Sequence, residues 1–204
     1  NDDHTICAVS QAVDNGLVEA ILVGDEKTIA SVCAAENIDI NKFKIVQESD
    51  DVKAAATACD IINRGEGDIL MKGLLPTDKY MRAILNKERG LCPANVTLSH
   101  MAVIENPNYH KLLFVSDAAI IPAPDFKQKQ TILKNLTSTA KALGISCPKV
   151  AVVTATEQMS VGMQACVDAA LLAKMADRGQ IKGAIIDGPI SLDLAIDAEA
   201  VQIK

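Results

Sequence analysis

The sequence predicts an α/β fold in which largely parallel strands are covered by helices on both faces. Apolar residues make up 49% of the 204 residues, yet there are only three Phe, two Tyr and no Trp. The core must therefore be aliphatic, which suits parallel strands that are buried on both sides. Short runs rich in Val and Ile also alternate with segments of helical periodicity along most of the chain, and this alternation is typical of β-α units.

The predicted strands are short apolar runs, each followed by a turn or capping residue. They are residues 20–23, 43–46, 68–71, 96–104, 112–115, 150–154 and 184–186. The predicted helices are residues 4–15, 27–36, 51–64, 78–88, 125–143 and 162–178. Gly16, Gly144 and Gly179 follow three of these helices and suit the left-handed conformation that often ends a helix.

Residues 96–115 interrupt the β-α alternation. Two strands there are joined almost directly through Asn106-Pro107-Asn108, which predicts an antiparallel pair at a domain junction. We therefore expect an N-terminal domain over residues 1–95 and a second α/β domain over residues 96–204. The chain opens on a helix-capping signature and ends within helical periodicity that begins near Ser191. This predicts a first domain without its first strand and a second domain that is incomplete at its C-terminal end.

The composition of the chain disfavours binding to nucleic acid and membranes. The net charge of −6 disfavours nucleic acid and anionic membranes as partners. No apolar run approaches the length of a membrane span, and no signal peptide is visible. The six cysteines are scattered without a Cys-x-x-Cys pair, which indicates free thiols and a cytoplasmic protein.

A basic segment in this acidic chain is the strongest candidate site. Residues 68–82 predict a strand that runs into Lys72-Gly73, then a short loop, then a helix capped by Thr77 that presents Arg82. Parallel sheets bind ligands beyond the carboxyl ends of their strands. A helix start offers free N–H groups, and a guanidinium matches phosphate geometry. These features predict an anion site, although the spacing alone favours an ordinary capped helix with a surface arginine.

A second candidate is the loop Asp187-Gly188-Pro189, followed by Asp193. Gly188 permits a tight turn and Pro189 suits a first helical turn, so a structural β-to-α corner explains all three loop residues. Two carboxylates without His or a third acid indicate a metal site only weakly. We expect no metal here and interpret Asp187 as an organiser of the loop.

Four further residues are weaker candidates for substrate contact. His100 is the histidine that falls in a predicted strand, and Ser99 beside it lacks the Gly-x-Ser-x-Gly setting of a serine nucleophile. Thr156 and Glu157 follow the predicted strand 150–154. Their position suits substrate binding, and capping of the following helix explains it nearly as well.

Residues 71–91 contain Met-Lys-Gly-Leu-Leu-Pro-Thr, then Met-Arg-Ala-Ile-Leu, then Gly-Leu. This stretch resembles the phosphate acetyl/butyryltransferase family and is most similar to phosphate butyryltransferases. Residues 98–103, 114–122, 170–179 and 185–195 resemble further segments of the same family. The resemblance covers essentially the whole chain.

The resemblance implies a three-layer αβα fold like that of isocitrate and isopropylmalate dehydrogenases, with two domains and a cleft between them. It implies reversible transfer of a short acyl group between coenzyme A and phosphate, without a permanently bound cofactor or metal. It also implies a homodimer or higher homo-oligomer. Arg82 would then be catalytic, and Asp193 would face the cleft. The thiol-activating Asp and the Ser-Arg pair of the family have no matching segment before Lys204.

Three alternatives remain open at this point. A phosphate acetyltransferase would differ only in its acyl group. A dehydrogenase of the wider fold predicts a dinucleotide site and a metal-binding cluster, and the sequence contains no Gly-x-Gly-x-x-Gly. A catalytically silent, acyltransferase-like binding or oligomerisation domain is compatible with the missing thiol-activating segment.

Overall fold

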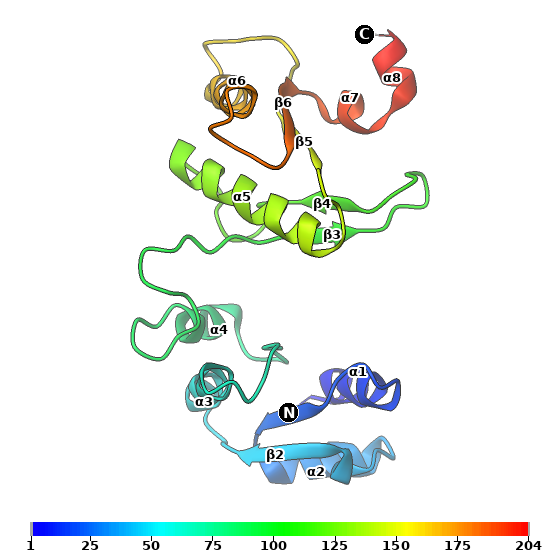
Figure 1. Ribbon diagram of the computed structural model, residues 1–204. Helices are drawn as coiled ribbons and strands as arrows, with labels where there is room; N and C mark the ends of the chain where they lie inside the picture. The colour runs from blue at the N-terminus through cyan, green and yellow to red at the C-terminus, as the bar shows by residue number, and fades with distance from the viewer. Residues whose placement is uncertain (1, 204) are drawn as a thin grey trace. The chain divides into compact units, whose positions relative to one another are not determined.

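The computed structural model describes residues 2–203 and confirms a mixed α/β architecture (Figure 1). The chain divides after Val96 into two compact units. Each unit contains parallel strand pairing and its own hydrophobic core. Within the described residues, no helix is both long and apolar enough to cross a bilayer.

The first unit is built on two parallel strands, β1 (Ala20–Gly24) and β2 (Phe43–Gln47), which pair over their whole length. Its helices are α1 (Asp3–Asp14), α2 (Glu26–Ala35), the short 3₁₀ helix η1 (Ile40–Lys42), α3 (Asp51–Asn63) and α4 (Thr77–Ile84). The aspartates before α1, α2 and α3 each accept a backbone N–H of the first helical turn. These carboxylates pair N–H groups that a helix leaves unsatisfied at its start.

The core of the first unit joins α1, α2 and β2. Ile6, Ile29, Cys33 and Phe43 are buried together, as the 3.6-residue spacing of apolar positions on α1 and α2 predicts. Helix α3 packs against β1, and α4 packs against α3. The candidate helix α4 is therefore supported by another helix.

The second unit contains one antiparallel and one parallel strand pair. Strands β3 (Ala102–Ile104) and β4 (Leu113–Val115) are antiparallel, and β5 (Lys149–Val153) is parallel to β6 (Ile185–Ile190). The helices are α5 (Phe126–Ala142), α6 (Gln164–Asp177), α7 (Leu192–Ile196) and α8 (Ala198–Ile203). The predicted antiparallel excursion is thus confirmed, as is the parallel pairing of the two strands that flank α6.

The core of the second unit joins α5, α6 and β6 through Leu133, Leu172 and Ile186. A charged pair crosses the same helix interface, where Lys129 Nζ lies 2.6 Å from a carboxylate oxygen of Asp168. The Asp168 side chain also accepts a hydrogen bond from Gln164. A carboxylate that is only 4% exposed needs such partners, because an unpaired buried charge is strongly destabilising.

Besides the strand predicted over 184–186, which extends to Ile190, four predicted elements are wrong in extent. Residues 68–71, all within the described part of the chain, form no strand, and the helix predicted over 78–88 ends at Ile84. The strand predicted over 96–104 shrinks to β3. The periodicity after Ser191 divides at Asp197 into two short helices. Local apolar patterning does not reveal whether a pairing strand is available, and hydrogen-bond partners decide these boundaries.

Candidate functional site

The loop before α4 is held by the N-cap of α1. Asp2 accepts the backbone N–H of Thr5 at 2.8 Å and that of Leu74 at 3.3 Å. A Cβ on Gly73 would lie 2.6 Å from the same carboxylate, so glycine allows this close approach. Burial raises the pKa of the Asp2 carboxyl, but the hydrogen bonds from Thr5 and Leu74 outweigh it and the net pKa is lowered.

Lys72 contributes to the same loop. Its ammonium lies 3.2 Å from the Leu75 carbonyl oxygen and 3.5 Å from that of Gly73. Tyr80 of α4 donates to the Leu70 carbonyl oxygen at 3.0 Å, so side chains replace the strand pairing that was expected over residues 68–71. Lys72 therefore has contacts within the loop, and its role in substrate binding stays a prediction.

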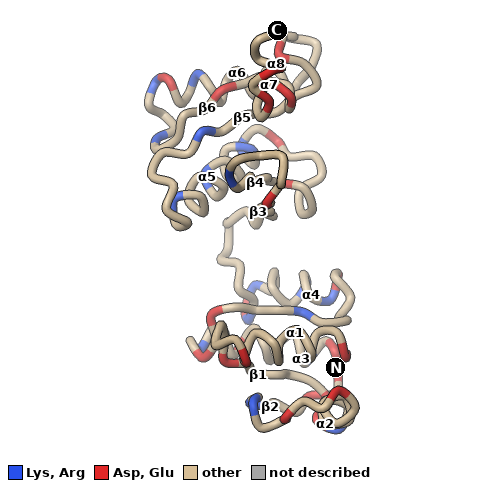
Figure 2. The backbone as a smooth tube through the Cα atoms, turned by 90° about the vertical axis from the view of Figure 1, so that its right-hand side faces the viewer, with Lys and Arg blue, Asp and Glu red and all other residues tan. Residues whose placement is uncertain are grey.

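Helix α4 begins differently from the prediction. Pro76 occupies the N-cap position, where no side-chain hydrogen bond forms, and Thr77 is the first helical residue. The prediction of Thr77 as the cap is therefore wrong by one position. The ring of Pro76 fixes its φ at a value that suits the entry to a helix. Figure 2 shows Lys and Arg gathered along α4 within a unit that is otherwise rich in acidic residues.

Among the charged residues of α4 that form ion pairs, Arg82 has the most exposed side chain. Its side chain is 83% exposed and lies 3.7 Å from the Asp78 carboxylate, one turn earlier. Exposed pairs of this kind contribute little to stability. The guanidinium is therefore accessible to another anion, and its assignment as a catalytic residue stays a prediction.

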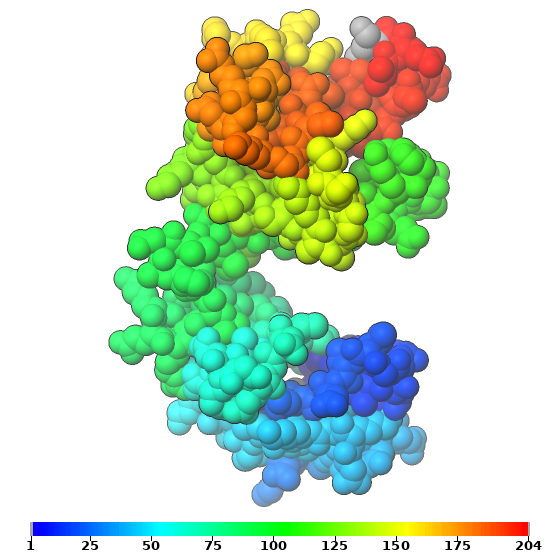
Figure 3. All heavy atoms as spheres, in the orientation of Figure 1, coloured from blue at the N-terminus to red at the C-terminus, as the bar shows by residue number. Residues whose placement is uncertain are grey.

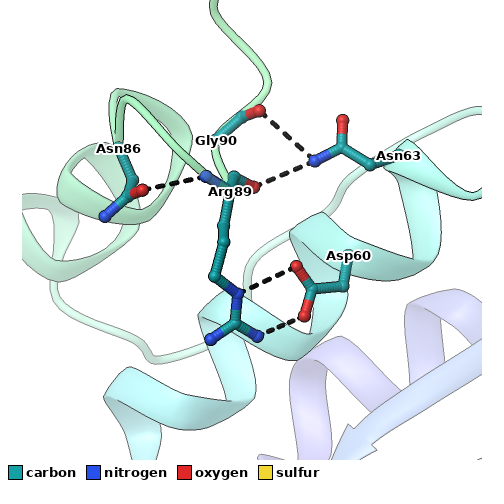
Figure 4. A network of polar contacts seen from close by, with 5 residues as sticks. All are labelled: Asp60, Asn63, Asn86, Arg89 and Gly90. Atoms are coloured by element: carbon teal, nitrogen blue, oxygen red, sulfur yellow. Dashed lines mark hydrogen bonds and ion pairs between the residues drawn. The ribbon is translucent and has the colours of Figure 1, made fainter.

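The segment after α4 is anchored to α3, as Figure 4 shows. Arg89 contacts both carboxylate oxygens of Asp60, with Nε at 3.1 Å from one of them. Asn63 Nδ2 donates to the carbonyl oxygens of Arg89 and Gly90 at 2.9 Å and 3.3 Å. The Arg89 guanidinium lowers the pKa of Asp60 by hydrogen bonding. This network fixes the position where α4 ends.

In the second unit, Ser99 and His100 precede β3 in a segment without strand pairing. Asn135 Nδ2 of α5 donates to Ser99 Oγ at 2.8 Å. The backbone N–H of His100 donates to Asp117 Oδ2 at 2.8 Å, and the Ser116 hydroxyl donates to the His100 carbonyl oxygen. His100 Nδ1 is buried and has no hydrogen-bond partner among residues 2–203.

Asp117 lies directly beyond β4 and gathers several backbone donors. Its Oδ1 accepts the N–H groups of Ala119 and Ile120, each at 2.8 Å. Burial raises the pKa of Asp117, but the backbone hydrogen bonds from Ile120, Ala119 and His100 together lower it by more, so the net pKa lies below its ordinary value. The sequence predicts Asp117 as the turn residue after the strand 112–115, but it does not indicate a role for this residue in a site.

At the carboxyl ends of β5 and β6, a backbone hydrogen bond joins the two strands. The backbone N–H of Thr154 donates to the Ile190 carbonyl oxygen at 2.9 Å. Beyond it, the Thr154 hydroxyl donates to the Thr156 carbonyl oxygen at 2.6 Å, and Thr156 Oγ1 accepts the N–H of Gln158 at 3.2 Å. Thr156 thus organises its own loop, and Glu157 follows it.

The residues Asp187, Gly188 and Pro189 do not form the predicted β-to-α corner. All three lie within β6, and the register shifts between Ala151 and Val153 of β5. A Cβ on Gly188 would lie 2.9 Å from Val152 and 3.2 Å from Ala169. Gly188 is thus a close-packing position between β5 and α6, where the sequence signal for a turn is misleading.

Asp187 and Asp193 lie in two successive elements, β6 and α7. Asp187 Oδ1 accepts the N–H of Gly188 at 2.9 Å, and Asp193 lies in the first turn of α7. Across residues 2–203, no three His, Cys, Asp or Glu side chains are grouped so that they could hold a metal ion.

A separate hollow of about 480 Å³ lies between the tip of the β3–β4 hairpin and the start of α8. Figure 3 shows the green hairpin tip beside the red C-terminal helices. The hollow is lined by Asn106, Asn108, Tyr109, His110, Ile196, Asp197 and Ala198. None of these residues was predicted as a site residue.

A family model described as phosphate acetyl/butaryl transferase matches residues 51–204. The chain therefore belongs to the phosphate acetyl/butyryltransferase family, as its sequence motifs predict.

Named relatives cover the whole chain. Phosphate butyryltransferase of Clostridium acetobutylicum is 43% identical over 203 residues, which are 100% of this chain and 67% of the relative. Phosphate acetyltransferase of Rhizobium meliloti is 36% identical over 203 residues, 100% of this chain and 64% of the relative. The chain thus spans about two thirds of the length of these relatives.

Solved structures agree with these relatives. A branched-chain phosphotransacylase from Enterococcus faecalis V583 superposes with a TM-score of 0.74 at 27% identity. The match covers 90% of this chain and 72% of that protein. The superposition therefore supports the α/β class described above.

Proposed function

We propose that the protein containing this chain is a phosphate acyltransferase that moves a short acyl group, butyryl or similar, reversibly between coenzyme A and inorganic phosphate. The observation that carries the proposal is the 43% identity to a phosphate butyryltransferase along essentially the whole chain. The substrates are acyl-CoA and phosphate, without a permanently bound cofactor or metal.

The reaction needs an anion site close to an acyl site. A phosphate oxygen attacks the thioester carbonyl carbon, the C–S bond of the resulting tetrahedral oxyanion breaks, and the thiolate leaves and takes up a proton. Positioning the phosphate and stabilising the oxyanion are the main tasks of the protein.

Arg82 is our candidate for holding the phosphate. Its guanidinium is 83% exposed and has an exposed carboxylate, Asp78, as its ion-pair partner. An incoming phosphate can therefore replace that partner and accept two parallel hydrogen bonds. Lys72, Gly73 and Thr77 lie on the loop and first turn that lead to Arg82, and they are our candidates for further contacts.

The remaining predicted residues are candidates for acyl-CoA contact. Ser99 and His100 lie beside the Asp117 turn, and Thr156 and Glu157 lie beyond β5. Asp187, Gly188 and Pro189 lie in β6, and Asp193 lies on α7. We name no thiol-activating residue, because the family segment that carries the thiol-activating Asp has no match in this chain.

The finer architecture and the setting of the enzyme are proposals as well. We propose a three-layer αβα fold of the isocitrate and isopropylmalate dehydrogenase type, with a domain boundary near residue 95 and the active site in a cleft between two domains. We also propose a cytoplasmic homodimer or higher homo-oligomer. Family resemblance and the α/β class support these assignments.

A thiol-release assay on the full-length protein tests the function. Acetyl-, propionyl- and butyryl-CoA are each incubated with phosphate, without added metal or nicotinamide, and free coenzyme A is measured. We expect phosphate-dependent release that is fastest with butyryl-CoA. No release with any of the three thioesters would remove the enzymatic assignment.

Phosphate acetyltransferase is the second candidate, because a relative with that name is 36% identical over the whole chain. The same assay separates the two. A higher kcat/KM for acetyl-CoA than for butyryl-CoA would favour the acetyltransferase.

A further inference from the structure

The segment that carries Ser99 and His100 is held by side chains. Strand pairing begins only at Ala102, so residues 97–101 lack the ladder hydrogen bonds that fix a strand. Three side chains, two from the segment after β4 and one from α5, bond to this segment instead. They are Ser116, Asp117 and Asn135.

Asp117 is the centre of this arrangement, because its two carboxylate oxygens serve two different segments. Oδ2 accepts the N–H of His100, while Oδ1 accepts the N–H groups of Ala119 and Ile120. One carboxylate thus ties the segment before β3 to the turn after β4. Charge-assisted bonds of this kind are stronger than bonds between neutral groups.

A purely structural turn would not require the bond to His100. Ala119 and Ile120 already form the ordinary Asp turn with Oδ1. The additional bond fixes the backbone of a residue whose Nδ1 atom is buried without a partner among residues 2–203. A buried polar atom without a hydrogen-bond partner is destabilising. The bonds to the backbone of His100 hold the Nδ1 atom in this unfavourable position.

We propose that Asp117 is a positioning residue of the acyl-transfer site, which sets the geometry of Ser99 and His100 for contact with the substrate. This inference rests on the proposed function, since it assigns Ser99 and His100 to that site. Asp117 itself acts through the backbone of His100 and needs no contact with the reacting atoms. The Ser116 hydroxyl, which donates to the His100 carbonyl oxygen, completes the support.

The test compares Asp117→Asn with Asp168→Asn in the full-length protein. An amide in place of Asp117 retains the size but has one acceptor oxygen, so one of the two segments loses its bond. Asp168 is a matched control because it is a buried carboxylate of the same unit with a lowered pKa, and its partners are on α5 and α6. Both variants should lose thermal stability.

We expect Asp117→Asn to lower kcat about 10- to 100-fold, because a small misplacement of a substrate-positioning group has an effect of this order. The phosphate KM should change less than threefold, since the predicted phosphate site lies on another segment. Asp168→Asn should keep the wild-type kcat at temperatures where it is folded. Ser116→Ala, which removes one bond only, should give a smaller loss of kcat than Asp117→Asn.

Amide hydrogen exchange provides a readout that does not depend on turnover. Peptides covering residues 97–101 should exchange at least tenfold faster in Asp117→Asn than in Asp168→Asn. Equal kcat in the two variants, or equal exchange of this segment, would overturn the positioning role. An inactive wild-type protein would instead overturn the proposed function, and exchange would still decide whether Asp117 holds the segment.

Discussion

At the scale of single residues, the basic segment that contains α4 and its flanking loops separates into side chains with different partners. Lys72 contacts loop carbonyl oxygens, Lys79 pairs with Asp51 at 3.2 Å, and Arg89 contacts both oxygens of Asp60. Arg82 has an exposed partner on its own helix. The sequence shows these four as similar positive charges, and their partners make Arg82 the best candidate among them for binding an external anion.

Replacing Arg82 with Ala should raise the phosphate KM and lower kcat/KM for phosphate by about 100- to 1000-fold, because a bidentate charged contact is worth a few kcal/mol. The KM for acyl-CoA should change little. Initial rates at varied phosphate concentration measure the effect. Arg64→Ala is the control, since Arg64 is exposed and paired with Glu66, and its kinetics should match the wild type. Unchanged kinetics in the Arg82 variant would show that the phosphate site lies elsewhere.

Gly90 is a position where the backbone excludes any side chain. A Cβ there would lie 2.8 Å from the Asn86 nitrogen and closer still to the carbonyl oxygens of Ile84 and Asn86. Gly90→Ala should therefore lower the free energy of unfolding by about 1–3 kcal/mol, as overpacking typically does. Chemical denaturation measures the change. Gly162→Ala, with its nearest atom at 3.9 Å, should be close to neutral, and an equal effect in both variants would contradict the steric explanation.

At the scale of elements, most of the fold was predictable from pattern. The strands β1, β2, β5 and β6 and the helices α1, α2, α3, α5 and α6 agree with apolar periodicity and capping residues to within a few positions. Residues 68–71 misled the prediction because an apolar run does not show whether a neighbouring strand exists. Ile69 is 76% exposed, and the segment is held by the Tyr80 hydroxyl.

The candidate site was predictable only in part, for a related reason. Gly188-Pro189 has the composition of a turn, yet packing against Val152 and Ala169 places it in a strand. Asp117 was predictable as a turn residue, but its bond to His100 was not, because the two residues are 17 positions apart. Contacts of this range depend on how β3 and β4 pair, and no local pattern contains that information.

The contact between α5 and α6 should make the second unit sensitive to acid. Burial raises the pKa of Asp168, whereas Lys129 and Gln164 lower it, and the net pKa lies below the usual 3.8. The unfolded chain therefore binds the proton more readily, so this stabilisation is complete above about pH 4 and is lost as the pH falls through the folded-state pKa. Between pH 5 and pH 3, roughly the range of an ordinary carboxyl titration, the wild type should lose more unfolding free energy than Asp168→Asn. Parallel pH slopes in the two proteins would contradict the assignment.

At the scale of the whole molecule, each unit has a hydrophobic core of its own. Each unit also has at least one buried cysteine, whose rate of labelling measures the opening of that unit. Cys59 is fully buried in the first unit, and Cys166 is 1% exposed in the second. Burial also raises the pKa of Cys59, which lowers its reactivity because the thiolate is the reacting form. Cys147 is exposed and provides an internal reference for rapid labelling.

Thiol labelling followed by mass spectrometry should therefore resolve the opening of each unit. We expect Cys147 to react first, and Cys59 and Cys166 to react only when their units open. Gly90→Ala should accelerate the labelling of Cys59 with little effect on Cys166. Equal acceleration at both thiols would show that the two units open in one cooperative step.

The proposed role of Arg82 in phosphate binding, together with its weak attachment, has a consequence for turnover. A guanidinium that exchanges one surface carboxylate for another anion breaks no buried network, so capture and departure of the anion require little rearrangement of α4. Such a group favours rapid cycling over tight retention, which suits a reversible catalyst whose product must leave as readily as its substrate arrives. It also exposes the step to competition from dissolved salts, so catalysis should weaken as ionic strength rises.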